Sequence, residues 1–434
     1  MKFTALILLI IHPIYSFGQK SNNNIIKLPL TFKNGYGPFG ASLSLFVFES
    51  TEANNSWSKT YLDVIGIPKN WKNVKKGTIC FDVYQFVYQN YSAKNISPAF
   101  YNDLQQSWKW IPDKPKLSFN PLKCYVYVAT GEDDKGKIWT IIDANNNLDF
   151  GDDNAFIPVE FILGKSIDSL SDNAIQVNYE RLYKGKIIQT KIPLLIVNVH
   201  SSLWYTYPQY AVAYLKKPGI KKEIAISSGE PNFSKPKIIL INDTLKIKKA
   251  KSDLIISNGE YVSIDNTIYK NKGVDFTNEV LELEKVTVNY QKLYSTQVNF
   301  KAIPFEGKEF IMKEVISLDK YKGKFLFIDF WGTWCGPCVN EIPNIKTAYE
   351  KFDKSKIEFL GIVGGDNATS LKKFIEKEKI LWPQILSDET NKIVEAYRIA
   401  GYPTSFLINP EGIIIAKNLR GEDLYNVITK LMTK

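Results

Sequence analysis

The sequence is poor in the side chains that most often bind transition metals. Its 434 residues include only 2 histidines and 4 cysteines. Histidine-rich metal sites are therefore excluded, and His200, inside the apolar run 194–200, is expected to be a structural strand residue. The net charge of +10 comes from lysines spread along the whole chain among acidic residues, not from a concentrated basic stripe. We therefore expect a solvated, lysine-rich surface and no nucleic-acid partner.

Apolar segments of membrane-spanning length are also absent from the sequence. The run from Phe3 to Ile11 follows Lys2 and is too short to cross a bilayer. Together with the small residues Ser16 and Gly18 it is typical of a signal peptide. We predict that residues 1–18 are removed after Gly18, which leaves an exported, periplasmic and soluble protein.

Residues 19–300 contain little helical periodicity. Short runs rich in β-branched and aromatic residues alternate with Gly, Asn, Asp and Pro, and one predicted strand covers residues 79–86. Only residues 98–106 have the pattern of a short helix. The regular spacing predicts antiparallel, sandwich-like sheets. We place a boundary near Pro218-Gly219, between a β-rich domain of unknown role (residues 19–218) and a second β-rich domain or subdomain (residues 219–299).

Two features of this β-rich region leave alternatives open. Cys80 and Cys124 fall in predicted strands, where they would form a disulfide or remain two buried free thiols. The loop 143–153 carries Asp and Asn on alternate residues, as a calcium loop does. Its match is partial, because Leu148 occupies the usual glycine position and Asn154 the position of the closing glutamate. A plain Asx-rich turn is favoured there over a calcium site.

From about residue 300, predicted strands alternate with predicted helices, which indicates an α/β domain with parallel strands. The apolar strand 325–330 and the helix 337–352 flank the sequence Trp334-Cys335-Gly336-Pro337-Cys338. Two thiols at this spacing can close an intramolecular disulfide, so the pair can hold or release two electrons. Half of a zinc site is the rival interpretation, but it needs two further ligands and few remain in the chain.

These residues resemble those of a known family. Residues 300–434 resemble a thioredoxin-fold domain of the TlpA/ResA-like group of exported bacterial thiol-disulfide oxidoreductases. The resemblance rests on residues 334–338, on Glu341-Ile342-Pro343, and on Gly401-Tyr402-Pro403-Thr404, which resembles the segment with the family's cis-proline. The predicted fold class is therefore multidomain, with an N-terminal β-rich (antiparallel sandwich-like) region followed by a C-terminal α/β thioredoxin-fold domain.

Chemistry and resemblance together predict the catalytic residues. Cys335 is expected to be the nucleophile, because its sulfur lies near a helix N-terminus that favours the thiolate. Cys338 is expected to resolve the mixed disulfide. Asp329, on an otherwise apolar strand, and Glu341, one helical turn beyond Cys338, are the proton-relay candidates.

The predicted substrate-binding residues surround the two sulfurs. Gly336 and Pro337 lie between them, and Trp334 is expected on their apolar rim. A cis bond between Tyr402 and Pro403 would offer backbone polar groups to a substrate strand. No metal ligand and no cofactor is predicted.

The leading functional hypothesis is a periplasmic protein-disulfide reductase. The resemblance implies client proteins with disulfides or thiols, for example cytochromes during maturation, and an electron donor such as a membrane thiol-transfer protein of the DsbD or CcdA kind. One alternative is an envelope binding protein whose β-rich region recognises a ligand or partner, with an accessory redox domain. Another is a disulfide isomerase whose β-rich domains dimerise, since the sequence leaves the oligomeric state open.

Overall fold

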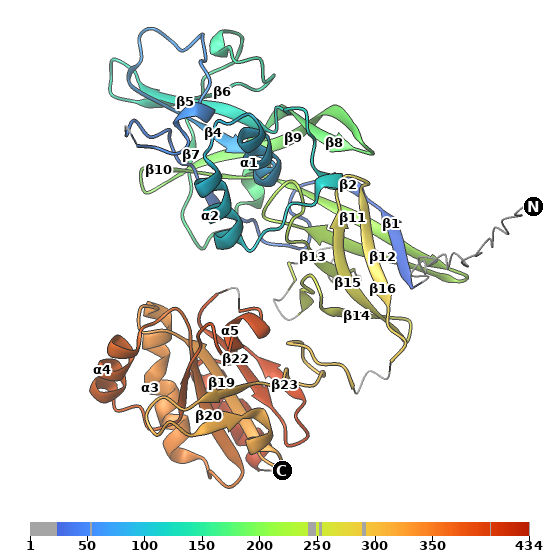
Figure 1. Ribbon diagram of the computed structural model, residues 1–434, viewed down its shortest axis with the longest axis vertical. Coiled ribbons are helices and arrows are strands. Elements are labelled where there is room, and N and C mark those ends of the chain that lie inside the picture. Colours follow the sequence, from blue (N-terminus) through green and yellow to red (C-terminus); the bar gives the residue numbers. More distant parts are fainter. Residues whose placement is uncertain are drawn as a thin grey trace, which may run out of the picture.

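A computed structural model describes residues 24–52, 54–241, 249–250, 254–288, 292–399 and 401–433. The predicted signal peptide, residues 1–18, lies outside the described residues. Figure 1 shows two strand-rich parts above an α/β part that contains the C-terminus. Within the described ranges, no helix combines the length and the apolar character that crossing a membrane requires.

The first strand-rich part contains two sheets. One has the strand order β4-β5-β6, and the other has the order β3-β10-β9-β7, with β8 also paired to β9. Only β7 runs parallel to its neighbour. One apolar cluster contains side chains from both sheets, such as Val126 and Ile196. The strands are β3 (Ser44–Leu45), β4 (Lys72–Cys80), β5 (Tyr125–Glu132), β6 (Ile138–Ile142), β7 (Val159–Glu160), β8 (Ile175–Tyr183), β9 (Lys186–Val199) and β10 (Ser202–Thr206).

Two α-helices lie within the described residues of this part. The structure confirms the predicted helix at residues 98–106 as α2 (Pro98–Trp108). The strand predicted at residues 79–86 is wrong, because β4 ends at Cys80 and α1 (Val83–Ser92) begins three residues later. Asp82 explains the change, since its carboxylate accepts the Gln85 N–H at 3.1 Å and so caps the helix.

The second strand-rich part has two four-stranded sheets, in the orders β1-β16-β15-β14 and β13-β12-β11-β2. Leu28 and Leu283 from the first sheet share an apolar cluster with Ile224 and Ile226 from the second. Figure 1 shows β1, in blue, among these yellow and green strands. The strands are β1 (Ile25–Pro29), β2 (Thr31–Asn34), β11 (Gln209–Lys217), β12 (Ile220–Ser227), β13 (Lys237–Leu240), β14 (Tyr261–Ile264), β15 (Thr267–Asp275) and β16 (Val280–Lys285).

The boundary that we predicted at Pro218-Gly219 falls inside this second part. Those two residues form the turn between β11 and β12, which are neighbours in one antiparallel sheet. Backbone hydrogen bonds therefore join the two sides of the predicted boundary. We propose instead that residues 36–206 form the first β-rich unit, and that residues 25–34 join 209–285 in the second.

The C-terminal part is the α/β domain that the sequence predicted. Its central sheet has the order β21-β20-β19-β22-β23, with β19, β20 and β21 parallel and β22 and β23 antiparallel. The elements are β17 (Glu306–Lys308), β18 (Val315–Ser317), β19 (Phe325–Trp331), α3 (Gly336–Lys351), β20 (Ile357–Val363), α4 (Ala368–Glu378), β21 (Gln384–Leu386), α5 (Ile393–Ala396), β22 (Thr404–Ile408), β23 (Ile414–Lys417) and α6 (Gly421–Met432).

Both faces of this sheet are covered. Phe327 and Trp331 of β19 pack in one apolar cluster with side chains of α3, α4 and α6, whereas Ile328 packs in a second cluster with α5. Alternate strand residues point to opposite faces. Asp329 therefore lies on the same face as Phe327 and Trp331, beneath α3.

The second β-rich unit contacts the α/β domain through the segment that joins them. The rings of Tyr261 and Phe300 stack with their centroids 5.3 Å apart. The side-chain amide of Gln297 bonds to the backbone of Tyr261 with both its atoms, at 2.7 Å each. In addition, Arg398 Nη1 donates to the Asn258 carbonyl at 2.9 Å. These contacts place the second β-rich unit beside α5.

Candidate active site

The two sulfurs lie where β19 passes into α3. Cys335 and Cys338 form a disulfide with their Cα atoms 5.2 Å apart. Cys335 is the N-cap residue of α3, and its sulfur accepts the Cys338 N–H at 3.3 Å. The exposed fraction is 5% for Cys335 and 1% for Cys338. The helix field and the exposure therefore both favour Cys335 as the sulfur that meets another molecule.

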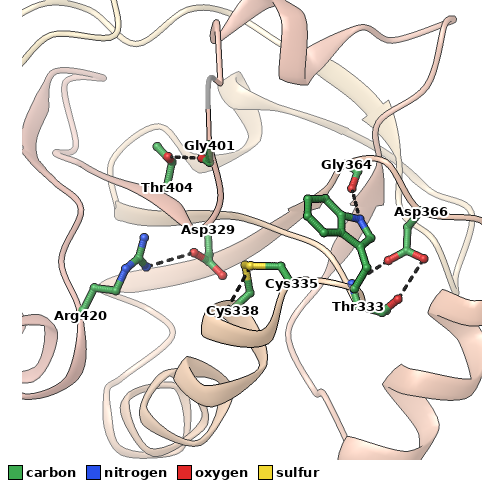
Figure 2. The surroundings of a disulfide bond; sticks show 10 residues. Asp329, Thr333, Cys335, Cys338, Gly364, Asp366, Gly401, Thr404 and Arg420 are labelled. Carbon is green, nitrogen blue, oxygen red and sulfur yellow. Dashed lines mark hydrogen bonds and ion pairs between the residues drawn. A yellow bond between two sulfur atoms is a disulfide. The ribbon is translucent and has the colours of Figure 1, made fainter. Parts of the chain in front are cut away.

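Two contacts from the segment after β20 fix the loop before Cys335, as Figure 2 shows. The Asp366 carboxylate accepts the backbone N–H of Thr333 at 2.7 Å and its hydroxyl at 3.0 Å. The indole N–H of Trp334 donates to the Gly364 carbonyl at 3.2 Å. Sequence reasoning missed Asp366 and Gly364. The sequence Gly364-Gly365-Asp366, directly after the predicted strand 357–363, was the one pattern that could have indicated them.

The rim of the site is aromatic. The side chain of Trp334 is 57% exposed, and its ring meets the Tyr402 ring edge to face at 5.3 Å. The peptide bond between Tyr402 and Pro403 is cis, as predicted. The structure thus brings the predicted substrate-binding residues of the first loop and those of the cis-proline loop to one place. Gly336 and Pro337 form the first turn of α3 between the sulfurs.

Asp329 is buried behind the sulfurs, at 4% exposure. Figure 2 shows it between the disulfide and Arg420. Its Oδ1 lies 3.7 Å from Arg420 Nη1, and neither atom has a hydrogen-bond partner within the described chain. Burial raises the pKa of Asp329 to about 7, the Arg420 charge opposes this rise, and the Glu341 charge adds to it. The predicted burial is confirmed, and the direction of the pKa shift agrees with the prediction, whereas Arg420 was not anticipated.

Glu341 is buried on α3 and both of its oxygens are engaged. One accepts the backbone N–H of Gly421 at 2.7 Å, and the other accepts the Asn344 amide at 3.1 Å. Glu341 therefore bonds α3 to the first residue of α6. The prediction that Glu341 shares a helix face with Cys338, one turn earlier, agrees with the structure, since both side chains are buried. Its part in proton transfer stays a prediction.

The other candidate positions lie in the β-rich region. Cys80 and Cys124 are free thiols, the first partly exposed and the second buried. Cys80 pairs across the sheet with Tyr125, one residue beyond Cys124. The Cys80 thiol donates to the Cys124 carbonyl at 3.7 Å, and burial together with the neighbouring Cys80 side chain raises the pKa of the Cys124 thiol. The two thiols are therefore neighbours that no disulfide joins in this structure. His200 lies in the exposed turn after β9 with a φ of 48°, not in the strand where the sequence placed it.

The side chains of the loop 143–153 hold the loop's own backbone. The Asp143 carboxylate accepts the N–H groups of Asn147 and Leu148 at 2.9 and 2.8 Å. The amides of Asn145 and Asn147 both donate to Asp152. These are the contacts of an Asx-rich turn. Over the part of the chain that the structure covers, no group of three His, Cys, Asp or Glu side chains is arranged to hold a metal ion.

Fold and site together define the C-terminal domain as a dithiol protein of the thioredoxin fold. Comparison with known proteins gives the same class, since residues 298–417 match the AhpC/TSA family. The chain is 30% identical over 136 residues to the thiol-disulfide oxidoreductase ResA of Bacillus thuringiensis subsp. konkukian, covering 31% of this chain and 74% of that protein. It is 31% identical over 159 residues to ResA of Geobacillus kaustophilus, covering 37% of this chain and 79% of that protein.

The chain belongs, through its C-terminal third, to the ResA family of thioredoxin-fold thiol-disulfide oxidoreductases. Among solved structures, it is 32% identical to the thioredoxin domain of a thiol-disulfide oxidoreductase from Bacteroides vulgatus. That match covers 32% of this chain and 99% of the other, with a TM-score of 0.29.

Proposed function

We propose that this protein is an exported, periplasmic protein-disulfide reductase whose dithiol cleaves client disulfides through a mixed disulfide on Cys335. One observation carries the proposal: the Cys335–Cys338 pair caps the N-terminus of α3, with the buried acid Asp329 behind it. The Gly336-Pro337 dipeptide between the sulfurs is that of reducing thioredoxins, which favours reduction over oxidation.

The first step joins enzyme and client. The Cys335 thiolate attacks one sulfur of the client disulfide, a new S–S bond forms, and the other client sulfur leaves as a thiolate that takes up a proton. Trp334 and the Tyr402-Pro403 loop flank the sulfur and supply the surface on which the client segment lies. Gly336 and Pro337 keep the approach to Cys335 free of large side chains.

The second step releases the client. The Cys338 thiol gives its proton to the Asp329 carboxylate, and the resulting thiolate attacks the Cys335 sulfur. The second client sulfur leaves as a thiolate and is protonated. The client has then gained two electrons and two protons, and the enzyme holds the disulfide seen here. A membrane dithiol protein must return two electrons and two protons before the next cycle.

The proton-transfer roles differ between the two buried acids. Asp329 has a pKa of about 7, so it can both accept and return a proton near neutral pH. Glu341 is the second candidate, but both of its oxygens already accept hydrogen bonds. We therefore assign the proton to Asp329, and to Glu341 the holding of α6 against α3.

The direction of the reaction is tested by the reduction potential of the purified protein. Equilibration with dithiothreitol and glutathione buffers should give a value near thioredoxin's, about −270 mV, and a value near DsbA's, about −120 mV, would indicate an oxidase. Catalysis of insulin reduction should accompany the low potential. Cys335→Ser should abolish that activity, and Cys124→Ser should leave it unchanged.

One observation favours a second role, in which the β-rich region binds a ligand. A cavity of about 350 Å³ lies between α1 and the second β-rich unit, and its wall includes Tyr84, Trp110, Arg181 and Phe276. Concave sites that combine aromatic and a few charged groups are the usual form of ligand pockets. If Cys335→Ser kept full physiological function, this binding role would be the principal one.

A further inference from the structure

We propose that Arg420 is a positioning residue whose guanidinium keeps the Asp329 carboxyl group able to accept the Cys338 proton at neutral pH. This inference rests on the proposed reductase chemistry and concerns a residue outside the motifs that identify the site. Arg420 touches neither sulfur. It acts through Asp329, which Figure 2 shows between the guanidinium and the disulfide.

The contact between Arg420 and Asp329 is direct and enclosed. Arg420 Nη1 lies 3.7 Å from Asp329 Oδ1, and the Asp329 side chain is only 6% exposed. Both atoms are buried, and within the described ranges neither makes a hydrogen bond. Their interaction is therefore electrostatic, in surroundings that water screens poorly. The guanidinium faces the acid without holding its proton-accepting oxygen in a hydrogen bond.

The helix that carries Cys338 also positions Arg420. Arg420 is the N-cap residue of α6, and its side chain does not cap the helix. The backbone is fixed one residue later, where Gly421 donates its N–H to Glu341 of α3 at 2.7 Å. Gly421 has a φ of 48°, in the left-handed region that favours glycine. The bond from Glu341 of α3 to Gly421 thus fixes the residue next to Arg420, and the Arg420 guanidinium faces Asp329.

Arginine suits this position better than lysine does. Only three of the 55 basic residues in the sequence are arginines, and one of them stands beside the buried acid. A lysine loses its proton readily when it is buried next to a titrating group, whereas a guanidinium keeps its charge. The opposing charge at Asp329 is therefore constant across the working pH range.

The charges around Asp329 come from few elements. Glu341 faces it from α3 and Arg420 from the start of α6. The neighbouring strands place Gly361 and Ser405 opposite it, and neither carries a charge. Burial and Glu341 raise the pKa of Asp329 and Arg420 lowers it. Without Arg420, a smaller fraction of the carboxyl group would be ionised at neutral pH, so it would accept the Cys338 proton less often.

The test compares pH–rate profiles of insulin reduction for the full-length protein and two neutral variants, Arg420→Met and Arg420→Gln. In the wild-type profile, the rate should rise with pH near pH 7 as Asp329 loses its proton, and this rising limb should be absent in Asp329→Asn. Removing the Arg420 charge should move that limb upward by about one pH unit or more, so the rate at pH 7 falls about fivefold and recovers by pH 9. Arg420→Lys, which keeps a positive charge, should shift the limb less.

Lys324→Met is the matched control. Lys324 precedes the same strand at its other end and pairs with Glu358 at 2.9 Å, so this variant also removes one positive charge from an ion pair. Its profile should equal that of the wild type. If both neutral Arg420 variants are slower at every pH but keep the wild-type midpoint, Arg420 has only a structural role and the inference is wrong.

A second readout does not depend on activity. Urea unfolding gives the free energy of unfolding of the oxidised protein at each pH. The difference between the wild type and Asp329→Asn changes with pH as Asp329 titrates, so it reports the titration midpoint of Asp329. That midpoint should also rise in the neutral Arg420 variants, and an unchanged midpoint overturns the inference. If the wild type does not reduce insulin while the unfolding midpoint still shifts, the proposed function is wrong and the charge interaction stands.

Discussion

The Glu341 carboxylate accepts the backbone N–H of Gly421 at 2.7 Å, which ties the helix bearing the cysteines to the helix at the C-terminus. This bond gives Glu341 a structural task, in keeping with our assignment of the proton transfer to Asp329. The charge of Glu341 also raises the pKa of Asp329. Substitutions can separate these effects.

We predict that Glu341→Gln retains stability and activity, because a glutamine oxygen can still accept the Gly421 N–H. Loss of the negative charge should move the Asp329-dependent limb of the pH–rate profile to lower pH. Glu341→Ala leaves the buried N–H without its acceptor and should cost about 1–3 kcal/mol, measured by urea unfolding. If Glu341→Gln abolishes activity at every pH, Glu341 itself transfers the proton.

Asp329 should make the oxidised protein less stable as the pH rises. Its folded-state pKa is about 7, well above the ordinary value of 3.8, so folding favours the protonated form. The stabilisation from the protonated form is complete below about pH 4 and is lost as the pH rises through 7. Asp329→Asn should therefore gain stability relative to the wild type, by on the order of 3 kcal/mol between pH 4 and pH 8. A pH-independent difference would show that Asp329 does not titrate in this range.

Asp366 should matter for activity more than for the fold. Asp366→Ala removes the acceptor of both the N–H and the hydroxyl of Thr333, so the loop before Cys335 loses its fixed geometry. We expect kcat/KM for insulin reduction to fall at least about tenfold. Asp353→Ala is a matched control, since Asp353 accepts the N–H and hydroxyl of Ser355 in the same way beyond the far end of α3. Equal losses in both variants would contradict the assignment.

Gly364 should not tolerate a side chain. A Cβ atom there would lie 2.1 Å from the Tyr402 hydroxyl, so Gly364→Ala must displace the tyrosine beside the cis-proline. Because the client is expected to bind at this rim, kcat/KM should fall by about tenfold to a hundredfold. Gly40→Ala is the control, since its Cβ would meet nothing within 4 Å. Unchanged kinetics in Gly364→Ala would show that Tyr402 is not part of the client-binding surface.

The oxidised protein should contain two free thiols, those of Cys80 and Cys124. Titration with Ellman's reagent in denaturant should therefore find two thiols per chain, and four after reduction of the Cys335–Cys338 bond. A value of zero in the oxidised protein would show that these two neighbouring thiols are joined in a disulfide.

The sequence was sufficient to predict the features whose residues lie close together along the chain. The strand-to-helix turn with Cys335 and Cys338 and the buried Asp329 lie within one short local pattern, and the cis bond at Tyr402-Pro403 was predicted from the resemblance of residues 401–404 to the family's cis-proline segment. Arg420, Asp366 and Gly364 did not emerge from the sequence, because crossovers bring them to the site from distant parts of the chain. Their positions depend on sheet order, which periodicity does not specify.

The same distinction explains the errors in the β-rich region. The run of β-branched and aromatic residues at 83–88 has strand character. The Asp82 cap favours a helix there, and so do the buried glutamines Gln85 and Gln89, which donate to the distant carbonyls of Ser118 and Leu122. Likewise, β1 pairs with β16 from the other end of the β-rich region, so no local pattern could reveal that residues 25–34 belong with residues 209–285. Pro218-Gly219 was mistaken for a domain boundary because Pro and Gly occur both in linkers and in tight turns, and only the pairing of β11 with β12 shows that this is a hairpin turn.

The central claim is that Cys335 forms mixed disulfides with client proteins and Cys338 resolves them. Trapping tests it most directly, with Cys338→Ala expressed in cells and Cys335→Ser/Cys338→Ala as the control. The single variant should accumulate dithiothreitol-sensitive adducts whose peptides, identified by mass spectrometry, are joined to Cys335. If the single variant holds no more partners than the double variant does, the account is contradicted.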